Sequence, residues 1–250
     1  MKPRHFLATA TGAALALVGV TPAVAEPVEE LVVRYDVTET DGNMAVDSSA
    51  FGNDGRLRGG VTRRNGAYRF HPSTRFGRYD RIVAPSDASM NPGSAPFSYG
   101  ARVKVRPNAK WSDTEMALIR HGDADTPGGD YKLELRRHEN GVVDALCEMS
   151  DRDRDGHGFV LGNGRTTIND GRWHTISCAR VDEDTVSVTV DGRSKERPTT
   201  GNLGSIVGDD PFLLGCQPAE FAPRRWREQL HGAMDDIYLT VLREPSDPSD

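Results

Sequence analysis

The chain has 250 residues, of which 36% are hydrophobic, and a formal net charge of −6, values typical of a soluble globular protein of one or two domains. The acidic balance argues against a general nucleic-acid binder. The only long apolar run lies at the N-terminus, so the composition excludes a bundle of membrane spans. Composition alone does not identify a function.

The first segment of the chain has the features of a secretory signal peptide. Lys2 and Arg4 precede an apolar stretch from Phe6 to Val20, and Ala23-Val24-Ala25 is a small-x-small cleavage pattern. We predict that residues 1–25 are removed and that the mature protein is secreted. A membrane anchor is the alternative, but it would need about 20 apolar residues.

Strand-like alternation dominates the rest of the chain. Residues 97–105 alternate apolar and polar side chains, and residues 186–191 do the same. Further candidate strands, separated by turns rich in Gly, Asn and Asp, are 131–136, 173–181 and 237–242. Strands without intervening helices predict an all-β fold, an antiparallel two-sheet β-sandwich or jelly roll, over residues 26–243. The polar residues 244–250 are expected to form a disordered tail.

Secretion changes the interpretation of the three cysteines, because thiols pair in an oxidising compartment. Cys147 and Cys178 lie on the apolar faces of two strand-like runs. We therefore predict a Cys147–Cys178 disulfide and a buried free thiol at Cys216. A disulfide that involves Cys216 is the alternative.

Four stretches of the sequence, in this order, resemble landmarks of laminin G-like domains of the concanavalin A-like superfamily. They are Val46–Leu57, Asp170–Thr175, Val188–Gly192 and Gly232–Ile237. In addition, Gly129–Leu133 and Cys178 resemble secreted actinobacterial members of this group. The resemblance implies a concanavalin A-like jelly roll. Since this fold hosts lectins, adhesion modules, glycosidases and lyases, function has to be argued from the site.

The tryptophans divide into one expected core residue and two candidate ligand contacts. Asp170-Gly171 is expected to form a tight turn that directs Trp173 into the core. Loop aromatics of jelly rolls can stack on sugar rings, which makes Trp111 and Trp226 candidates for carbohydrate binding. The arginines around Trp226 favour an anionic glycan. The alternative for each loop tryptophan is a side chain that caps the core.

Catalytic motifs of the superfamily are incomplete in this sequence. The glucanase pattern Glu-x-Asp-x-x-Glu begins at Glu39-Thr40-Asp41, but Met44 takes the place of the second glutamate. Lys132–Arg136 imitates the Arg-x-Glu-Leu-Arg strand of alginate-lyase relatives, without their Gln-x-His motif. We interpret Glu134 and Arg136 as an exposed cross-strand ion pair. The motifs therefore favour a non-catalytic protein, with a polysaccharide hydrolase or lyase as the alternative.

One metal site is expected at the last predicted strand. By alternation, Asp235 would share a face with Ile237, and a carboxylate on an apolar face is costly unless it is paired or metal-bound. The family resemblance implies a structural Ca²⁺ held by Asp235, Asp36 and the loop from Asn53 to Gly55. A salt bridge to an arginine such as Arg34 is the alternative.

A second candidate metal loop contains Asp151, Asp153 and Asp155, which together with Gly156 imitate the first half of a calcium-binding loop. The twelfth position is Gly162 instead of a bidentate glutamate. Arginines between the aspartates also offset the negative charge. A solvated hairpin tip is therefore the alternative.

These observations predict a secreted β-sandwich, supported by calcium, that acts as a non-catalytic binding module. Carbohydrate or extracellular polysaccharide is the expected ligand. An enzyme of the same fold and a protein-binding adhesion module are the alternatives.

Overall fold

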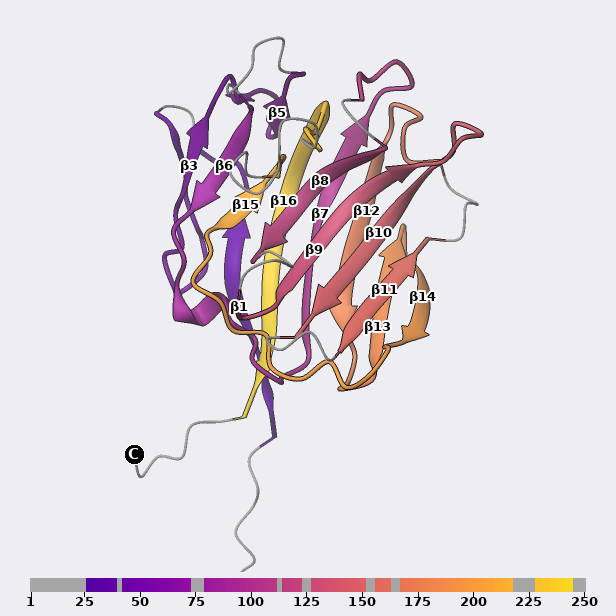
Figure 1. The fold of residues 1–250 in the computed structure, drawn as a ribbon. Coiled ribbons are helices and arrows are strands. Elements are labelled where there is room, and N and C mark those ends of the chain that lie inside the picture. The colour runs from indigo at the N-terminus through magenta and orange to yellow at the C-terminus, as the bar shows by residue number, and fades with distance from the viewer. Residues whose placement is uncertain are drawn as a thin grey trace, which may run out of the picture.

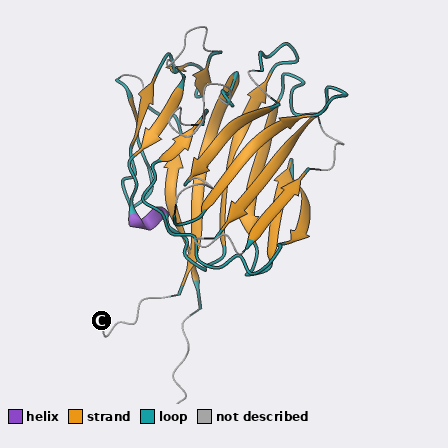
Figure 2. Cartoon of the chain, in the orientation of Figure 1, coloured by secondary structure: helices purple, strands orange, loops and turns teal. Residues whose placement is uncertain are grey.

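The computed structural model describes residues 26–39, 42–72, 79–111, 114–122, 127–151, 156–162, 167–217 and 228–244. Within these ranges the chain forms two antiparallel β-sheets that pack face to face (Figure 1). Figure 2 shows strands throughout and one short 3-10 helix, η1 (Ala88–Met90). The predicted all-β sandwich is therefore confirmed. No helix in the described ranges is long and apolar enough to cross a membrane.

The first sheet has the strand order β14-β13-β12-β7-β16-β5-β4, and β1 also pairs with β16. Its strands are β1 (Val28–Tyr35), β4 (Thr62–Arg63), β5 (Tyr68–Phe70), β7 (Phe97–Val105), β12 (Trp173–Arg180), β13 (Thr185–Val190), β14 (Arg193–Pro198) and β16 (Gly232–Arg243). The beginning of β16 pairs with β5 and its later part pairs with β1 (Figure 1). The last strand thus lies inside the sheet, with β7 on one side and with β5 and β1 on the other.

The second sheet has the strand order β11-β10-β9-β8-β15-β6-β3-β2. Its strands are β2 (Met44–Ala45), β3 (Gly55–Arg58), β6 (Arg81–Ala84), β8 (Glu115–His121), β9 (Asp130–Arg137), β10 (Val143–Ser150), β11 (His157–Leu161) and β15 (Phe212–Leu214). In Figure 1 the long strands β8, β9 and β10 cross in front of β16, β7 and β12 of the first sheet.

The core lies between the sheets and contains an aromatic cluster. The alternation predicted for residues 97–105 places Phe97 and Tyr99 of β7 inward, where they meet Tyr131 of β9. The ring centroids of Tyr99 and Tyr131 are 4.9 Å apart. The Tyr99 hydroxyl donates a hydrogen bond to the Lys132 carbonyl at 3.0 Å, so its polar atom is satisfied although the side chain is fully buried. The two sheets are thus joined by polar as well as apolar contacts.

The predicted disulfide is confirmed. Cys147 of β10 is bonded to Cys178 of β12, with a Cα–Cα distance of 5.6 Å, so the bond links the two sheets through the core. Cys216 is a buried free thiol, as predicted. Burial raises the pKa of the Cys216 thiol to about 12, which keeps it protonated and unreactive at neutral pH.

The prediction that Trp173 enters the core is wrong. Trp173 is directly opposite Lys104 of β7, and the inward positions of its strand are His174, Ile176 and Cys178. Trp173 is therefore on the outer face of the first sheet, where the Arg102 guanidinium lies 5.2 Å from its ring centroid. The tight turn before Trp173 is present, but the Trp173 side chain projects from the outer face of the sheet and not into the core.

The expected placement of Asp235 on the apolar face of the last strand is also wrong, because β16 contains a β-bulge. The register of β16 against β7 shifts between Asp235 and Tyr238, and Asp236 has a positive φ of 56°. Ile237 beyond the bulge is fully buried in the core, whereas Asp235 lies opposite the outward-facing Arg102. An extra residue in one strand reverses the alternation, so period-two counting fails across this point.

Candidate ligand-binding pocket

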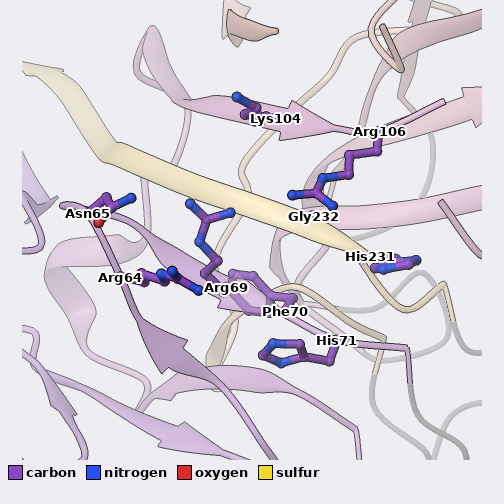
Figure 3. Close-up of a pocket in the computed structure, with 9 residues that line it drawn as sticks. All are labelled: Arg64, Asn65, Arg69, Phe70, His71, Lys104, Arg106, His231 and Gly232. Carbon is purple, nitrogen blue, oxygen red and sulfur yellow. The ribbon is translucent and has the colours of Figure 1, made fainter. Parts of the chain in front are cut away.

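A cationic pocket of about 470 Å³ opens at one end of the first sheet (Figure 3). Its lining residues, which come from the β4–β5 turn, β5, the end of β7 and the start of β16, are Arg64, Asn65, Arg69, Phe70, His71, Lys104, Arg106, His231 and Gly232. The volume falls in the range of small-molecule sites. No acidic residue is among these lining residues.

Strand pairing positions the two central cations of the pocket. Ala233 of β16 is directly opposite Arg69 of β5 on one side and Lys104 of β7 on the other. Directly opposed residues of antiparallel strands project from the same face, and the neighbours of Lys104 in β7 face the core. Arg69 and Lys104 therefore both project from the outer face of the sheet. Figure 3 shows the guanidinium groups of Arg69 and Arg106 pointing toward β16 from its two sides.

The positive charge of the pocket is not neutralised by the described part of the protein. Arg64, Arg69, Lys104 and Arg106 form no salt bridge with any described residue. The Nε atom of Arg69 is buried and has no hydrogen-bond partner among the residues that the structure describes. A buried N–H donor without a partner is unusual and costs about 1–3 kcal/mol. The pocket therefore offers both charge and unsatisfied donors to a ligand with acidic oxygens.

Two histidines form one end of the pocket and are held by different partners. The His71 ring nitrogen Nδ1 lies 3.0 Å from Asp80, whose side chain also accepts the His71 backbone N–H at 2.7 Å. His231 Nδ1 accepts the backbone N–H of Lys110 at 2.7 Å. In the neutral ring this places the proton of His231 on Nε2. Burial, with further effects from His71 and nearby cations, lowers the pKa of His231, so the ring is neutral at pH 7.

The chemistry of this arrangement is that of anion recognition. Arginine and lysine donate charge-assisted hydrogen bonds to carboxylate, sulfate or phosphate oxygens, and Phe70 adds an apolar wall. The lining residues contain no serine, cysteine or carboxylate that could act as a nucleophile. The described lining residues thus offer positive charge, hydrogen-bond donors and an apolar wall.

The carboxylates expected to hold calcium are paired with arginines. Arg102 Nη1 lies 3.1 Å from Asp235 Oδ2, and Arg34 bridges Asp36, at 2.5 Å, and Asp236. The salt-bridge alternative is thus present, although the partner of Asp235 is Arg102. The Arg34 guanidinium thus lies between two carboxylates, and calcium binding by Asp36, Asn53 and Asp235 stays a prediction.

The third expected ligand, Asn53, is committed to the surrounding loop. Its side-chain Nδ2 donates to the Val32 carbonyl at 2.9 Å and to Ser89 Oγ at 3.0 Å, and its carbonyl accepts the Tyr35 hydroxyl at 2.6 Å. The acid that organises this loop is Asp47, which accepts the backbone N–H groups of Arg34 and Asn53, both at 2.7 Å. Backbone donors satisfy Asp47 without a metal ion.

The second predicted metal loop is only partly described. Asp151 is buried, its Oδ1 atom has no hydrogen-bond partner, and its backbone N–H donates to the Gly156 carbonyl at 3.2 Å. Asp153 and Asp155 lie outside the described residues. Calcium binding by this loop stays a prediction.

The two tryptophans expected to contact carbohydrate have different outcomes. Trp111 is half-buried against the core, and the Arg137 guanidinium covers its ring at 5.2 Å from the centroid. The loop of Trp111 meets the pocket at Lys110, the partner of His231. Trp226 lies outside the described residues. A sugar contact by either tryptophan stays a prediction.

The pocket itself was missed by sequence reasoning, although one signal was present. Arg102 and Lys104 are on the polar face predicted for residues 97–105, and Arg106 continues the same alternation. The sequence therefore indicates that this face of the strand is basic. Arg69 of β5 and Ala233 of β16 are 35 and 129 residues away from Lys104 in the sequence, so only the sheet order brings them to it. Local patterns do not specify such neighbours.

Comparison with known proteins supports the fold. The sequence model of the laminin G domain family matches residues 145–240. No curated protein matches the chain.

The interpretation of Glu134 and Arg136 as an exposed pair is wrong, because Glu134 is only 1% exposed and Arg136 pairs with Glu115 instead.

Several similar solved structures are receptor-binding or ligand-binding domains of toxins. The binding domain of Paraclostridial Mosquitocidal Protein 1 has a TM-score of 0.61 and 14% identity, over 87% of this chain and 50% of that one. The receptor-binding domain of botulinum neurotoxin D has a TM-score of 0.59 and 13% identity, over 87% and 50% of the two chains. The ligand-binding domain of botulinum neurotoxin serotype D in complex with N-acetylneuraminic acid has a TM-score of 0.60 and 14% identity, over 87% and 48%.

The chain spans about half the length of these toxin domains, and the low identity shows a shared fold only. The order of the landmark stretches, the match to the family model and the two-sheet sandwich agree with one another. Residues 145–240 thus match the laminin G domain family, and the described residues of the chain form a two-sheet jelly-roll sandwich.

Proposed function

We propose that this protein is a binding module for acidic carbohydrate, such as a sialylated or uronate-containing glycan, and that the cationic pocket is its binding site. The observation that carries the proposal is the group of four cations that have no acidic partner among the described residues, together with the buried Arg69 Nε, which has no hydrogen-bond partner there. Carboxylates of acidic sugars are matched by guanidinium groups.

The structural relatives support the class of ligand. One similar structure is a toxin domain in complex with N-acetylneuraminic acid, and another is the binding domain of botulinum neurotoxin DC in complex with SialylT. Both ligands are bound to the toxin domains named, not to this chain. They are consistent with the charge of the pocket in this chain, which was established from its own residues.

We further propose that the protein acts outside the cell. The Cys147–Cys178 disulfide requires an oxidising environment to persist, and the N-terminal sequence has the features of a signal peptide. Intact mass of the protein from the culture medium tests this proposal, because a secreted species should begin at residue 26. A protein that keeps Met1 in the medium contradicts the cleavage.

The ligand proposal is tested with a glycan array that contains sialylated, uronate-containing, sulfated and neutral glycans. We expect binding to acidic glycans that weakens as salt is raised, since the contact is between charges. Lys104→Ala and Arg69→Ala should each reduce affinity about tenfold, which corresponds to roughly 1.4 kcal/mol. Arg193→Ala, in the exposed edge strand β14, is the matched control and should bind like the unaltered protein.

Three outcomes contradict the proposal. Equal binding of neutral and acidic glycans removes the role of charge, and unchanged binding in the Lys104→Ala and Arg69→Ala variants removes the pocket. Release of reducing ends or unsaturated products from an acidic polysaccharide favours an enzyme. Absence of any glycan binding favours a protein-binding adhesion module.

A further inference from the structure

Three glutamates form a cluster on the second sheet, separate from the cationic pocket of the first sheet. Glu115 begins β8, Glu134 is in β9, and Glu228 lies just before β16. Each offers a carboxylate oxygen, and these oxygens lie within 4.8 Å of one another. No other group of three or more acidic, histidine or cysteine side chains in the described ranges is arranged in this way.

The backbone holds the three glutamates together. Glu134 is directly opposite Ala117 of β8, two residues after Glu115. The Ala117 backbone N–H donates to the Glu228 carbonyl at 2.7 Å, so the segment of Glu228 lies along the other side of β8. The like charges of the three carboxylates repel one another, but the backbone hydrogen bonds of β8 with β9 and with Glu228 hold the glutamates together.

Glu134 and Glu228 are buried with unsatisfied oxygens. Glu134 is 1% exposed and neither of its carboxylate oxygens accepts a hydrogen bond from a donor in the described ranges; Glu228 is 7% exposed and its Oε2 atom accepts none there either. Two nearby cations have printed carboxylate partners: Lys132 pairs with Glu148 at 3.0 Å, and Arg136 pairs with Glu115, the most exposed of the three glutamates, at 3.2 Å. A buried carboxylate without partners is strongly unfavourable, so the cluster calls for a counter-charge.

The electrostatics agree with this geometry. Burial raises the pKa of Glu134 well above its usual range, and the nearby Glu228 raises it further. Lys132 and Arg120 act in the opposite direction but do not overcome burial.

We propose that Glu115, Glu134 and Glu228 together bind a divalent cation of the Ca²⁺ class. Carboxylate oxygens are the ligands that hard divalent ions prefer. Ca²⁺–oxygen distances of about 2.3–2.6 Å allow two ligands of one ion to be up to about 5 Å apart. The 4.8 Å limit on the carboxylate oxygens satisfies this condition.

Gln217 supports the position of one ligand. With its amide oriented to satisfy both neighbours, Gln217 donates to Glu228 Oε1 at 3.2 Å and accepts from Arg120 Nη1 at 3.1 Å. This leaves the unpaired Oε2 atom of Glu228 available to the ion. Supporting hydrogen bonds that orient a ligating group are typical of metal sites.

The test uses the full chain, stripped with a chelator and titrated calorimetrically with CaCl₂ and, separately, with MnCl₂. We expect one ion to bind per chain and the melting temperature to rise with its concentration. Glu134→Gln keeps the shape of the side chain and removes its charge, and it should weaken binding at least tenfold. Glu228→Gln should do the same, and serves as the second variant if Glu134→Gln fails to fold.

Asp235→Asn is the matched control, since Asp235 is paired with Arg102 and lies on the other sheet. It should bind the ion as the unaltered protein does. The proposal is overturned if the unaltered protein binds neither ion, if binding persists in both glutamine variants, or if it is lost in Asp235→Asn. Glycan binding is measured in parallel, and because the pocket is on the first sheet, either proposal can fail without the other.

Discussion

Arg102 of β7 and Asp235 of β16 lie directly opposite one another, with Arg102 Nη1 3.1 Å from Asp235 Oδ2. The β-bulge at Asp236 turns this carboxylate to the outer face, where Arg102 also covers the ring of Trp173. One backbone irregularity therefore converts an expected core carboxylate into a cross-strand ion pair.

This pair should contribute little to stability. The Arg102 and Asp235 side chains are 42% and 20% exposed, so solvent screens their attraction. A double-mutant cycle of Arg102→Ala and Asp235→Ala, measured by urea unfolding, should give a coupling energy below about 1 kcal/mol. A coupling several times larger, or one that depends on added Ca²⁺, would show that Asp235 has another partner.

Removing the disulfide should have a much larger effect. Cys147 and Cys178 are 31 residues apart, and closing a loop of that length stabilises the folded state by roughly 3–4 kcal/mol in the chain-entropy model. The Cys147→Ala, Cys178→Ala protein should melt about 10 °C lower in scanning calorimetry. A Cys216→Ala protein should keep its sensitivity to reducing agent. If reduction had no effect on that control, pairing through Cys216 would replace the proposed assignment.

His174 should make stability depend on pH. Its Nδ1 lies 2.8 Å from Asp191 and its Nε2 lies 3.1 Å from Asp170. Burial lowers the pKa of His174, but these hydrogen bonds outweigh burial and raise it above its ordinary value. The stabilisation is therefore complete below the unfolded pKa of about 6.5 and is lost as pH rises through the folded pKa.

The measurement for His174 is the free energy of unfolding across this pH range. The unaltered protein should lose stability as pH rises above about 6.5, and His174→Asn should lose less. Asp191→Asn removes one of the two acceptors and should give an intermediate slope. Identical slopes in all three proteins would show that His174 is neutral throughout.

Glycan binding should become tighter at acidic pH. His231 is neutral at pH 7, because burial and neighbouring cations lower its pKa, and its protonation adds a positive charge to the pocket. Affinity for an acidic glycan should rise severalfold between pH 7 and pH 5, while the sugar carboxylate stays ionised. His231→Gln should flatten this rise without abolishing binding at pH 7, and a rise that persists in His231→Gln would contradict the role of His231.

Much of the fold follows from local patterns. Alternation over residues 97–105 and 186–191 predicted β7 and β13, and the common apolar faces of Cys147 and Cys178 predicted the disulfide. These features depend on a period of two and on burial, which neighbouring residues specify. Asp191 and Gly192 make the tight reversal between β13 and β14, where both residues have a positive φ.

The sites depended on the tertiary structure. The bulge in β16 placed Asp235 and Ile237 on opposite faces of the sheet, and no local pattern marks an inserted residue. The glutamate cluster and the cationic pocket each join segments far apart in the chain, such as Glu134 with Glu228 and Lys104 with Arg69.

The sequence by itself therefore determined the two-sheet architecture, the disulfide and the free thiol, since these follow from short-range alternation and from the chemistry of the residue types. Only the tertiary structure decided which charged side chains meet. Strand order and register set those contacts, and they are determined by the packing of the whole sandwich.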